Sequence, residues 1–471
     1  MDGTTSSLLD QTWAAIAAAG DGAPPGPPAP LAVTGPAGHL PSRHRVEEAA
    51  VAGAGAALLA AAALARQRGV PAPDVALERG HVAAAVRSER FFRLGGRPRS
   101  RLAAAGFAPL SRFWRAADGW VRTHGNYPWH RAALLRALGC SDDPDAIAAA
   151  IAERTAHDVE ERVFAEGGVA AAVRSPEAWR AHPQGEALAA APLVAHRALG
   201  PAPARAREAA DLPMRGVRVL DLTRVIAGPV CTRFLAALGA DVLRLDPPDH
   251  PDLPPGAAAD TLLGKRSALL DLDTADGLDA AHRLLDGADV AVLGYRPGAL
   301  DRFGLGADRL AERHPGLVAV YLDAWGWSGP WSGRRGFDSV VQAASGIADG
   351  ESGGAEEPGA LPCQLLDHGT GYLAAAAAMD AVRRQTVLGG THARYLSLAR
   401  TAWWLTAAGP SGPAAPAPDE GSWTVDVAAA GGPATVVAPP GRLSGRPLAW
   451  PAPLTGYGAD PPAWPERSGY R

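Results

Sequence analysis

The chain has few cysteines, almost no lysine and no long uninterrupted apolar run. Cys140, Cys231 and Cys363 stand far apart, which excludes a disulfide framework or a zinc site built on cysteine pairs. Because charged residues make up 20% of the chain and the net charge is only -4, nothing indicates a nucleic-acid partner. The N-terminus has no basic and apolar leader, and charge or glycine breaks the apolar runs. We therefore expect a soluble, cytoplasmic protein without a membrane span.

Proline and glycine are concentrated at 21–42, 198–214 and 408–422, and these clusters divide the chain. A length of 471 residues allows at least two domains. Between the first two clusters, apolar periodicity predicts helices over 46–68, 131–138 and 145–165, with a short hairpin around 117–122. The first half of the chain is therefore expected to be mainly helical.

From Arg215 onward, apolar strands alternate with helices. The expected strands are 217–222, 241–245, 267–272, 289–293 and 317–322, with helices near 229–238, 276–286 and 299–312. This alternation predicts an α/β fold with a parallel sheet that helices cover on both faces. Ligands of such sheets bind beyond the carboxyl ends of the strands, which here are expected to carry Arg224, Lys265, Tyr295, Arg296 and Trp325. The chain has no GxGxxG motif, so a nicotinamide or flavin dinucleotide is not expected.

Asp367 follows an apolar stretch and precedes an alanine-rich helix that is expected to reach Arg384. Gly369 and Gly371 permit a tight turn at the start of that helix, and a helix N-terminus stabilises negative charge. We therefore expect an ionised, partly sheltered carboxylate that can act as a nucleophile. An ordinary N-cap is the alternative explanation. His368 is expected either to orient this carboxylate or to serve as a cap or surface residue.

Histidines and tryptophans form two further groups. His124 and His130 lack a third ligand at suitable spacing, so a loop or substrate-lining role is favoured over a metal site. Trp325, Trp327 and Trp331 are expected either to line an acyl pocket or to pack in the core.

A weak internal echo links the two halves of the chain. The alanine-rich stretch 54–68 and the following 74–77 resemble 371–385 and the following 395–398. In this alignment Asp367 falls near Ala49, which is not an aspartate, although Glu47 and Glu48 are adjacent. A chance similarity between alanine-rich helices is the alternative.

Seven short blocks follow one another in the second half of the chain. They are Gly216–Pro229 (GVRVLDLTRVIAGP), Leu238–Val242, Gly264–Ser267, Tyr295–Leu300, Gly336–Asp338, Gln342–Gly346 and Asp367. In sequence and order they resemble the family III CoA transferases, a family that also contains α-methylacyl-CoA racemases. Seven blocks in register over about 150 residues are far more specific than any single block.

The resemblance implies a Rossmann-like parallel-sheet domain at 215–407, which would bind CoA and catalyse, and a smaller, mainly helical α+β domain at 90–200. The remaining parts would be an N-terminal segment (1–42), a partial repeat of the large-domain helix–strand unit (43–89), a linker (201–214) and a C-terminal tail (408–471). In the family the small domain follows the catalytic half, whereas here it precedes it. The resemblance therefore implies a chain that is permuted or assembled from two partial copies. The resemblance also implies a homodimer.

By the resemblance, Asp367 corresponds to the catalytic aspartate, which forms an acyl-aspartyl anhydride and then an aspartyl-CoA thioester. The implied CoA contacts are Arg224, Val225, Ala227, Leu270, Tyr295, Arg302 and Arg335. Arginine suits phosphate groups, and a tyrosine ring can cover adenine. Acyl-CoA and a carboxylate would be the substrates, with no permanently bound cofactor and no metal. Ile226 and Pro247 depart from the polar residues of some members, and the family's glycine-rich loop has no clear match.

Two other functions stay open. A racemase would need two acid–base groups beside the α-carbon, and Phe337 stands where the racemases carry a histidine, so this alternative is disfavoured. A non-catalytic CoA-binding protein is the third hypothesis, and the retention of Asp367 in its Gly-x-Gly context argues against it.

Overall fold

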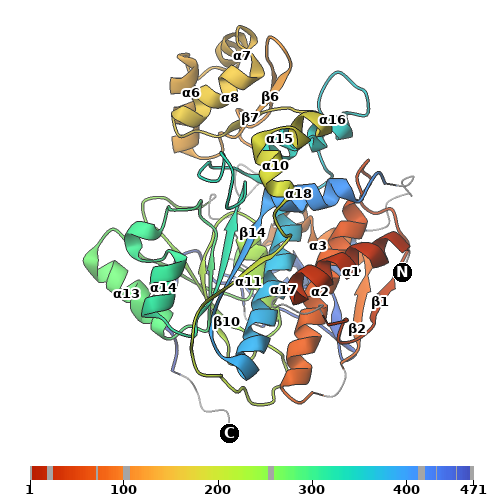
Figure 1. Cartoon of the computed structure of the whole chain (residues 1–471), viewed down its shortest axis with the longest axis vertical. Helices are drawn as coiled ribbons and strands as arrows, with labels where there is room; N and C mark the ends of the chain where they lie inside the picture. Colours follow the sequence, from red (N-terminus) through yellow and green to blue (C-terminus); the bar gives the residue numbers. More distant parts are fainter. Residues whose placement is uncertain are drawn as a thin grey trace.

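The computed structural model describes residues 3–18, 25–70, 73–98, 107–252, 259–411, 420–430, 432–451 and 453–466. Parts of the predicted N-terminal segment and C-terminal tail lie outside these ranges. The chain forms a large α/β body with a small domain at one end, shown at the top of Figure 1.

A seven-stranded sheet forms the centre of the body, in the order β11-β10-β9-β12-β13-β14-β8. Its strands are β8 (Ala195–Gly200), β9 (Arg218–Leu222), β10 (Asp241–Asp246), β11 (Arg266–Leu269), β12 (Val290–Leu293), β13 (Val318–Asp323) and β14 (Thr391–Ser397). All neighbours pair in parallel except β8, which is antiparallel to β14. The predicted parallel sheet is confirmed.

Helices cover both faces of this sheet, so strands such as β12 and β13 are buried at every position. The covering helices include α11 (Ala227–Ala237), α13 (Ala275–Asp286), α14 (Ala307–Arg313), α17 (Leu365–Leu388) and α18 (Leu398–Ala407). Short turns η1 (Ala259–Leu262) and η2 (Asp301–Phe303) complete the connections. The segment 299–312, expected as one helix, is instead η2 followed by α14, because Gly304 and Gly306 interrupt it.

Strand β8 differs from the expectation, since it belongs to the segment assigned to the small domain but joins the large sheet. Its pairing with β14 contains an irregularity between Thr391 and His392. Without β8, β14 would expose a row of unpaired backbone groups at the sheet edge. The antiparallel strand therefore closes this edge.

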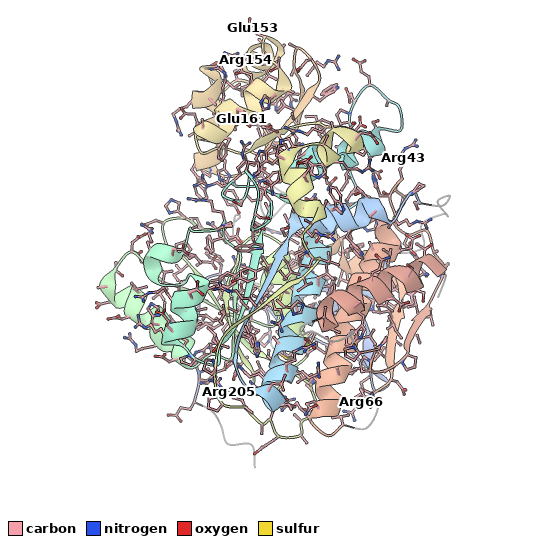
Figure 2. All side chains as sticks on the ribbon, viewed as in Figure 1. Arg43, Arg66, Glu153, Arg154, Glu161 and Arg205 are labelled. Carbon is pink, nitrogen blue, oxygen red and sulfur yellow. The ribbon has the colours of Figure 1, made fainter. Side chains whose placement is uncertain are left out.

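The small domain has its own core of apolar side chains. Its sheet contains β5 (Phe113–Arg115), β6 (Trp120–Thr123) and β7 (Ala170–Ala172), and its helices are α6 (Pro128–Leu138), α7 (Pro144–Ala152) and α8 (Ala156–Ala165). The predicted hairpin is β5–β6. Asp143 and Thr155 cap the starts of α7 and α8, which separates the predicted 145–165 segment into two helices. Charged residues such as Glu153 and Arg154 lie on this end of the molecule (Figure 2).

Four short helices join the small domain to the body. They are α9 (Pro176–Arg180), α10 (Pro183–Ala189), α15 (Asp338–Ala344) and α16 (Ile347–Ser352). The backbone N–H of Arg174 donates to the carbonyl of Ala343, which ties the chain after β7 to α15.

The N-terminal unit repeats the arrangement at the end of the large sheet. It consists of α1 (Gly3–Ala17), β1 (Leu31–Thr34), α2 (Val46–Gln67), β2 (Val75–Glu78), α3 (Arg79–Ala85) and α4 (Ser88–Phe91). Strands β1 and β2 are parallel, as β13 and β14 are. Strand β2 continues directly into α3 and β14 into α18, and the last strand residue, Glu78 or Ser397, caps the helix in each case. The order helix–strand–helix thus occurs twice, in agreement with the internal echo.

Helices α2 and α17 run side by side (Figure 1). Their alanines and glycines allow a close approach: a Cβ atom at Gly53 would lie 3.7 Å from the Cβ atom of Tyr372. Helix α2 is long and apolar enough to cross a membrane by length and composition, but 89% of its most apolar window is buried inside this structure. Because α2 is enclosed by protein on all sides, it is apolar all round.

The segment after residue 408 pairs with the N-terminal half. Its elements are η3 (Glu420–Trp423), β15 (Thr424–Val427), β16 (Ala434–Val437), β17 (Arg442–Leu443) and β18 (Arg446–Pro447). Strand β17 pairs with β2, and β16 pairs with β3 (Arg93–Leu94), which is joined to β4 (Arg97–Pro98). The described part of the predicted tail is therefore integrated into two small sheets.

Candidate functional site

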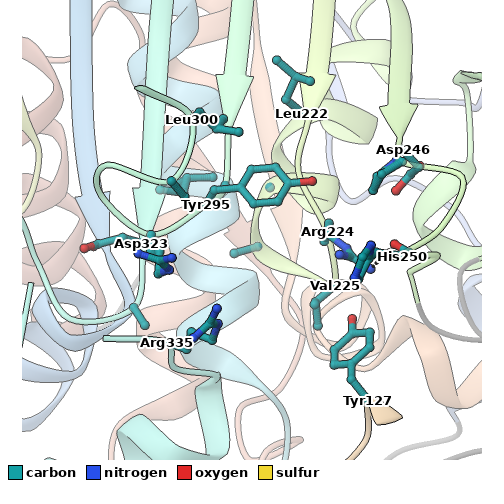
Figure 3. Close-up of a pocket in the computed structure, with 18 of the residues that line it drawn as sticks. Tyr127, Leu222, Arg224, Val225, Asp246, His250, Tyr295, Leu300, Asp323 and Arg335 are labelled. Carbon is teal, nitrogen blue, oxygen red and sulfur yellow. Dashed lines mark hydrogen bonds between the residues drawn. The ribbon is translucent and has the colours of Figure 1, made fainter. Parts of the chain in front are cut away.

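A cavity of about 510 Å³ opens beyond the carboxyl ends of the central strands. It is lined by all eight residues predicted as site residues: Asp367, Arg224, Val225, Ala227, Leu270, Tyr295, Arg302 and Arg335. Figure 3 shows Tyr295 and Arg335 on one side and Arg224 and Val225 on the other. Residues that sequence blocks place far apart thus surround one space, at the edge where ligands of parallel sheets bind.

Asp367 lies in the first turn of α17, but it does not cap the helix. The N-cap residue is Gln364, and the side chain of Asp338 accepts the backbone N–H of Asp367 at 2.9 Å. Asp338 also accepts from Gln342 Nε2. Among the described residues, none donates a hydrogen bond to the carboxylate of Asp367. The N-cap alternative is therefore wrong, and this carboxylate is available to a ligand in the cavity.

The electrostatics of Asp367 differ from the expectation of a carboxylate kept ionised by its helix. Burial, followed by the negative charges of Asp338 and Glu89, raises the pKa of Asp367 well above its ordinary value. Burial also raises the pKa of Asp338, to about 6. Desolvation and two neighbouring carboxyl groups therefore outweigh the helix N-terminus, which is worth about 0.3 to 1 kcal/mol at an exposed site.

Val225 and Arg224 form a strained turn after β9. Val225 has φ of 66°, in the left-handed region that a β-branched residue rarely adopts. Its N–H donates to Asp252 Oδ2 at 3.1 Å, which holds this backbone in place. Arg224 donates to the carbonyls of His250 and Pro251, and its guanidinium lies 5.4 Å from the ring centre of Tyr127. Strain of this kind is typical of functional sites.

Glycines bring α11 and α17 together beside Asp367. A Cβ atom at Gly371 would lie 2.6 Å from the carbonyl oxygen of Ala227, and one at Gly228 would lie 2.2 Å from Thr223 Cβ. Neither position can accept a larger residue without movement of the backbone around it. Ala227 therefore reaches the cavity next to Asp367 because Gly371 and Gly228 have no side chain.

The remaining predicted contacts lie on the opposite wall. Burial raises the pKa of Tyr295 above its ordinary value, and its ring, like the side chain of Leu270, packs against a core cluster that contains Leu222 and Leu293. Arg302 is exposed and pairs with Asp273 at 2.8 Å. Burial, and then the positive charge of Arg296, lowers the pKa of Arg335. The wall therefore offers several cations to an anionic ligand.

The small domain supplies the lid of the cavity, which the sequence blocks of the large domain did not include. Tyr127, Trp129 and His130 line the cavity from the loop before α6 and its first turn. Tyr127 donates to Asp252 Oδ1 at 2.8 Å. The signal was present in the Thr123–His130 segment, for which a loop or substrate-lining role was favoured over a metal site, and His130 lines the cavity.

Phe337, also on the cavity wall, stacks on His124 with ring centres 3.8 Å apart and an interplanar angle of 11°. Burial, and then the nearby His130, lowers the pKa of His124 to about 3. Burial, and then Arg335 and Arg224, lowers the pKa of His130 to about 4. Both imidazoles are therefore neutral at physiological pH.

Two residues expected at the ligand-binding edge, Lys265 and Trp325, do not line the cavity. Lys265 precedes β11 and is buried, with its Nζ donating to Asp221 Oδ2 at 3.0 Å. Trp325 packs with Trp331 and Trp179 in the core, so the core-packing alternative holds for these two tryptophans. Both positions were expected from strand ends alone, which do not reveal the direction of a side chain.

One group in the described residues has the proximity that a metal site requires, namely His157, Glu160 and Glu161. Glu160 forms a two-pronged pair with Arg174, and Glu161 pairs with Arg334 at 2.8 Å. These carboxylates are therefore already neutralised by arginine.

Comparisons with known proteins agree with the geometry. The sequence profile of CoA-transferase family III matches residues 214–456. The chain is 36% identical to the acetyl-coenzyme A transferase nodX of Hypoxylon pulicicidum over 199 residues, which are 41% of this chain and 33% of that protein. It is 36% identical to the probable fatty acyl-CoA transferase Rv3272 of Mycobacterium tuberculosis over 182 residues, 36% of this chain and 46% of that protein.

The similarity covers only part of each relative. An acyl-CoA transferase of Gibberella moniliformis is 32% identical over 302 residues, 59% of this chain and 53% of that protein. The chain thus spans about a third to a half of the length of the curated relatives it matches. A crystal structure of Rv3272 aligns with 33% identity and a TM-score of 0.39, covering 42% of this chain and 56% of that one.

Proposed function

The chain belongs to CoA-transferase family III, and from this premise we propose that it transfers CoA from an acyl-CoA donor to a carboxylic acid acceptor. The proposal rests on which residues line the cavity. Asp367 presents a carboxylate without a hydrogen-bond donor among the described residues, in the same cavity as all seven predicted CoA contacts. A nucleophile and a set of cations thus face one space.

The proposed reaction has four covalent steps. Asp367, whose pKa is raised, first loses its proton to solvent. Its carboxylate then attacks the donor thioester and expels CoA thiolate, which leaves an acyl-aspartyl anhydride. The thiolate attacks the aspartyl carbonyl, which releases the donor acid and forms an aspartyl-CoA thioester. The acceptor carboxylate then attacks this thioester, and the expelled thiolate attacks the acceptor carbonyl of the new anhydride. Acceptor acyl-CoA leaves, and the Asp367 carboxylate is restored.

Each step exchanges one carboxyl derivative for another, so no ATP is consumed. A thiol with pKa about 8.5 is a good leaving group, and covalent catalysis divides the exchange into easier steps. The anhydride must be kept from water. Tyr127, Trp129 and Phe337 supply an aromatic cover over the cavity that serves this purpose.

Arginines are proposed to hold the phosphates of CoA. Arg224, Arg302 and Arg335 lie on the cavity wall, and a guanidinium forms charge-assisted bonds with phosphate oxygens. The ring of Tyr295 is proposed to cover the adenine. The substrates are then acyl-CoA and a carboxylate, and CoA is not a permanent cofactor.

The surroundings of Phe337 support a transferase over a racemase. Removal of an α-proton requires a base whose pKa is near the working pH. The two histidines beside Phe337 have pKa values of about 3 and about 4, so they are weak bases. A transferase acts at the carbonyl and has no need of such a base.

We also propose a homodimer in the cytoplasm. Cys140, Cys231 and Cys363 are all free, as is usual for a protein kept in a reducing compartment.

The function is tested by incubating the protein with a panel of acyl-CoAs and carboxylates and identifying the CoA products by mass spectrometry. We expect CoA transfer without ATP, and a loss of about a thousandfold or more in Asp367→Ala with CoA binding retained. Hydroxylamine or borohydride should trap the intermediate on a peptide that contains Asp367.

A glutamate in the corresponding helix of the N-terminal unit provides the control. Glu48 is half-buried on α2 and pairs with Arg45 at 3.5 Å, so Glu48→Ala should keep near-normal turnover. Glu47 is unsuitable, because it holds the N–H groups of Gly38 and His39 and pairs with Arg79. Trapping on another acidic residue, or turnover in Asp367→Ala equal to that of the wild type, would refute the assignment.

A further inference from the structure

Asp252 lies just outside the catalytic cavity and joins the two domains that form it. The residue is only 4% exposed and is not one of those that line the cavity. Its Oδ1 accepts the hydroxyl of Tyr127 at 2.8 Å. Its Oδ2 accepts the N–H of Val225 at 3.1 Å and Nη2 of Arg244 at 2.6 Å. One carboxylate therefore holds the small domain, the strained turn after β9 and a residue of β10.

This carboxylate stays charged in spite of its burial. Burial alone would raise the pKa of Asp252, but the positive charges of Arg244 and then Arg224 hold that pKa below its ordinary value. Arg244 is itself fully buried and also pairs with Asp246 at 2.7 Å, so its charge is fixed in position. A hydrogen bond from a hydroxyl to a carboxylate is roughly twice as strong as one between neutral groups. The bond from Tyr127 to Asp252 is therefore a strong contact between the two domains.

Tyr127 and Trp129 pack on the body at the same place. Their rings are stacked with centres 4.8 Å apart, and the guanidinium of Arg224 lies 5.4 Å from the first ring centre and 5.8 Å from the second. Trp129 also meets His250 edge-on, with ring centres 5.1 Å apart. Arg224 in turn donates to the carbonyl of His250 at 2.8 Å. The aromatic side chains of the small domain and an arginine proposed to hold phosphate therefore share one contact with the body.

The opposite side of the cavity is joined by a different pair. There Arg334 pairs with Glu161 of α8 at 2.8 Å. Figure 3 shows Arg335, which follows Arg334, on that side, and Tyr127 beside Val225 on the other. The small domain is thus joined to the body on both sides of the cavity, and the bond from Tyr127 closes the side next to the turn after β9.

We propose that Asp252 is a positioning residue for the transferase reaction. Acting through Tyr127 and Val225, it holds the small domain closed on the turn after β9, and this closure decides whether the acyl-aspartyl anhydride meets CoA thiolate or water. The inference rests on the proposed function, which supplies the anhydride. Because Asp252 does not line the cavity, it acts on the partition between transfer and hydrolysis and not on the nucleophile.

The hydrolysis that closure prevents is a loss of the anhydride to water. Water adds to a carbonyl of the anhydride, the bond from that carbonyl to the bridging oxygen breaks, and the donor acid and the free carboxylate of Asp367 result. The water supplies two protons, of which one converts the CoA thiolate into free thiol and the other goes to solvent. One acyl-CoA is thus lost for each water that reacts, and no acceptor is converted.

Tyr127→Phe tests the contact directly, because it keeps the ring and removes only the hydroxyl that Asp252 accepts. The measurement compares free CoA, from a thiol assay, with CoA transferred to an added carboxylate. Loss of one hydrogen bond should raise the ratio of hydrolysis to transfer by about two- to tenfold. Tyr321→Phe is the matched control, since it removes a buried hydroxyl that donates to the carbonyl of Leu305 and that residue does not line the cavity. Its ratio should equal that of the wild type.

Asp252→Asn should raise the same ratio at least as far, because the uncharged amide holds both Tyr127 and Val225 less well. In the double variant with Tyr127→Phe, the second change should add less than it does in the wild type, since both act on one bond. Two unrelated structural defects would instead multiply. A purely structural role for Asp252 would lower the melting temperature and leave the ratio unchanged.

Hydrogen–deuterium exchange tests the closure without any substrate. In Tyr127→Phe the amides of residues 123–131 should exchange about two- to tenfold faster than in the wild type or in Tyr321→Phe. If no acyl-CoA and carboxylate support transfer, the proposed function fails, and this exchange alone decides whether Asp252 holds the domain closed. If Asp252→Asn loses its fold, Tyr127→Phe decides. The inference is overturned if Tyr127→Phe exchanges as the wild type does, or if its ratio of hydrolysis to transfer is unchanged.

Discussion

At the scale of single residues, the centre of the site is a group of carboxyl groups brought together from three elements. Asp367 lies on α17, Asp338 on α15 and Glu89 on α4 in the N-terminal unit. His368 is buried beside them, with its Nε2 3.5 Å from Glu89 Oε2. A residue of the N-terminal unit thus sets the charge around the proposed nucleophile.

This arrangement predicts how the pH dependence of activity responds to Glu89→Gln. Glu89 contributes to the raised pKa of Asp367, so removing its charge should lower that pKa. Because Asp367 attacks only when deprotonated, the acidic limb of kcat/KM should move to lower pH. Measurement of kcat/KM against pH decides this.

Glu312→Gln serves as the control, since Glu312 is exposed and paired with Arg309. Its acidic limb should coincide with that of the wild type. An unchanged or upward-shifted limb in Glu89→Gln would show that Glu89 does not act on Asp367.

Sequence analysis predicted residues that share one cavity, but it did not predict the charge state of Asp367. All eight predicted residues line one cavity, because each lies in one of the seven blocks or, like Leu270, Arg302 and Arg335, within three residues of one. The raised pKa of Asp367 was missed, since a helix N-terminus can be recognised from local sequence whereas Asp338 and Glu89 approach only through tertiary packing. The expected position of Lys265 was wrong for a related reason. Its ammonium group forms a buried salt bridge with Asp221, which only tertiary packing brings close.

At the scale of elements, the contact between α11 and α17 positions the site. Gly371 has an ordinary helical backbone, so its role is confined to the space that a side chain would need. A Cβ atom there would lie 2.8 Å from Val230 Cβ as well as close to Ala227. The contact has no room for a methyl group.

Gly371→Ala should therefore destabilise the protein by about 1 to 3 kcal/mol and reduce turnover, because Ala227 and Asp367 would move apart. Gly369→Ala, two residues earlier in the same helix, is the matched control. A Cβ atom at Gly369 would meet only Thr401 Cγ2, at 3.6 Å. Its effect should be neutral or stabilising by up to about 1 kcal/mol, because alanine favours a helix.

Thermal unfolding and turnover of both variants provide the measurement. Equal melting temperatures for the two alanine variants would contradict the claim that the α11–α17 contact is limited by the side chain at Gly371.

Strand β8 is an element that the sequence did not predict. Its sequence, Ala195–Gly200, lacks an apolar alternation, and in the structure its residues are half-buried or exposed. Edge strands are specified by the strand that they cover more than by their own sequence. Strands β9, β10, β12 and β13, which are buried at nearly every position, were predicted to within one residue, whereas the inner strand β14 was not predicted.

At the scale of the whole molecule, two similar helix–strand–helix units pair within one chain through α2 and α17. The internal echo foreshadowed this pairing. We expect a homodimer, which was implied by the resemblance to the family.

Sedimentation at micromolar concentration should show a mass of twice 48.3 kDa. A single species of 48.3 kDa would instead show that the α2–α17 pairing makes the chain self-sufficient, with its own N-terminal unit replacing a second subunit. Gel filtration at several protein concentrations separates a weak dimer from either result.

The position of α2 has a consequence for synthesis on the ribosome. Val46 is made about 320 residues before Leu365, where α17 begins, which at about 5 to 20 residues per second is a delay of about 16 to 64 s. During that interval α1, which precedes this long apolar helix in the chain, is available to pack on it, but the face that α17 later covers has no partner. We expect that face of the nascent chain to bind chaperones until the second half of the protein emerges.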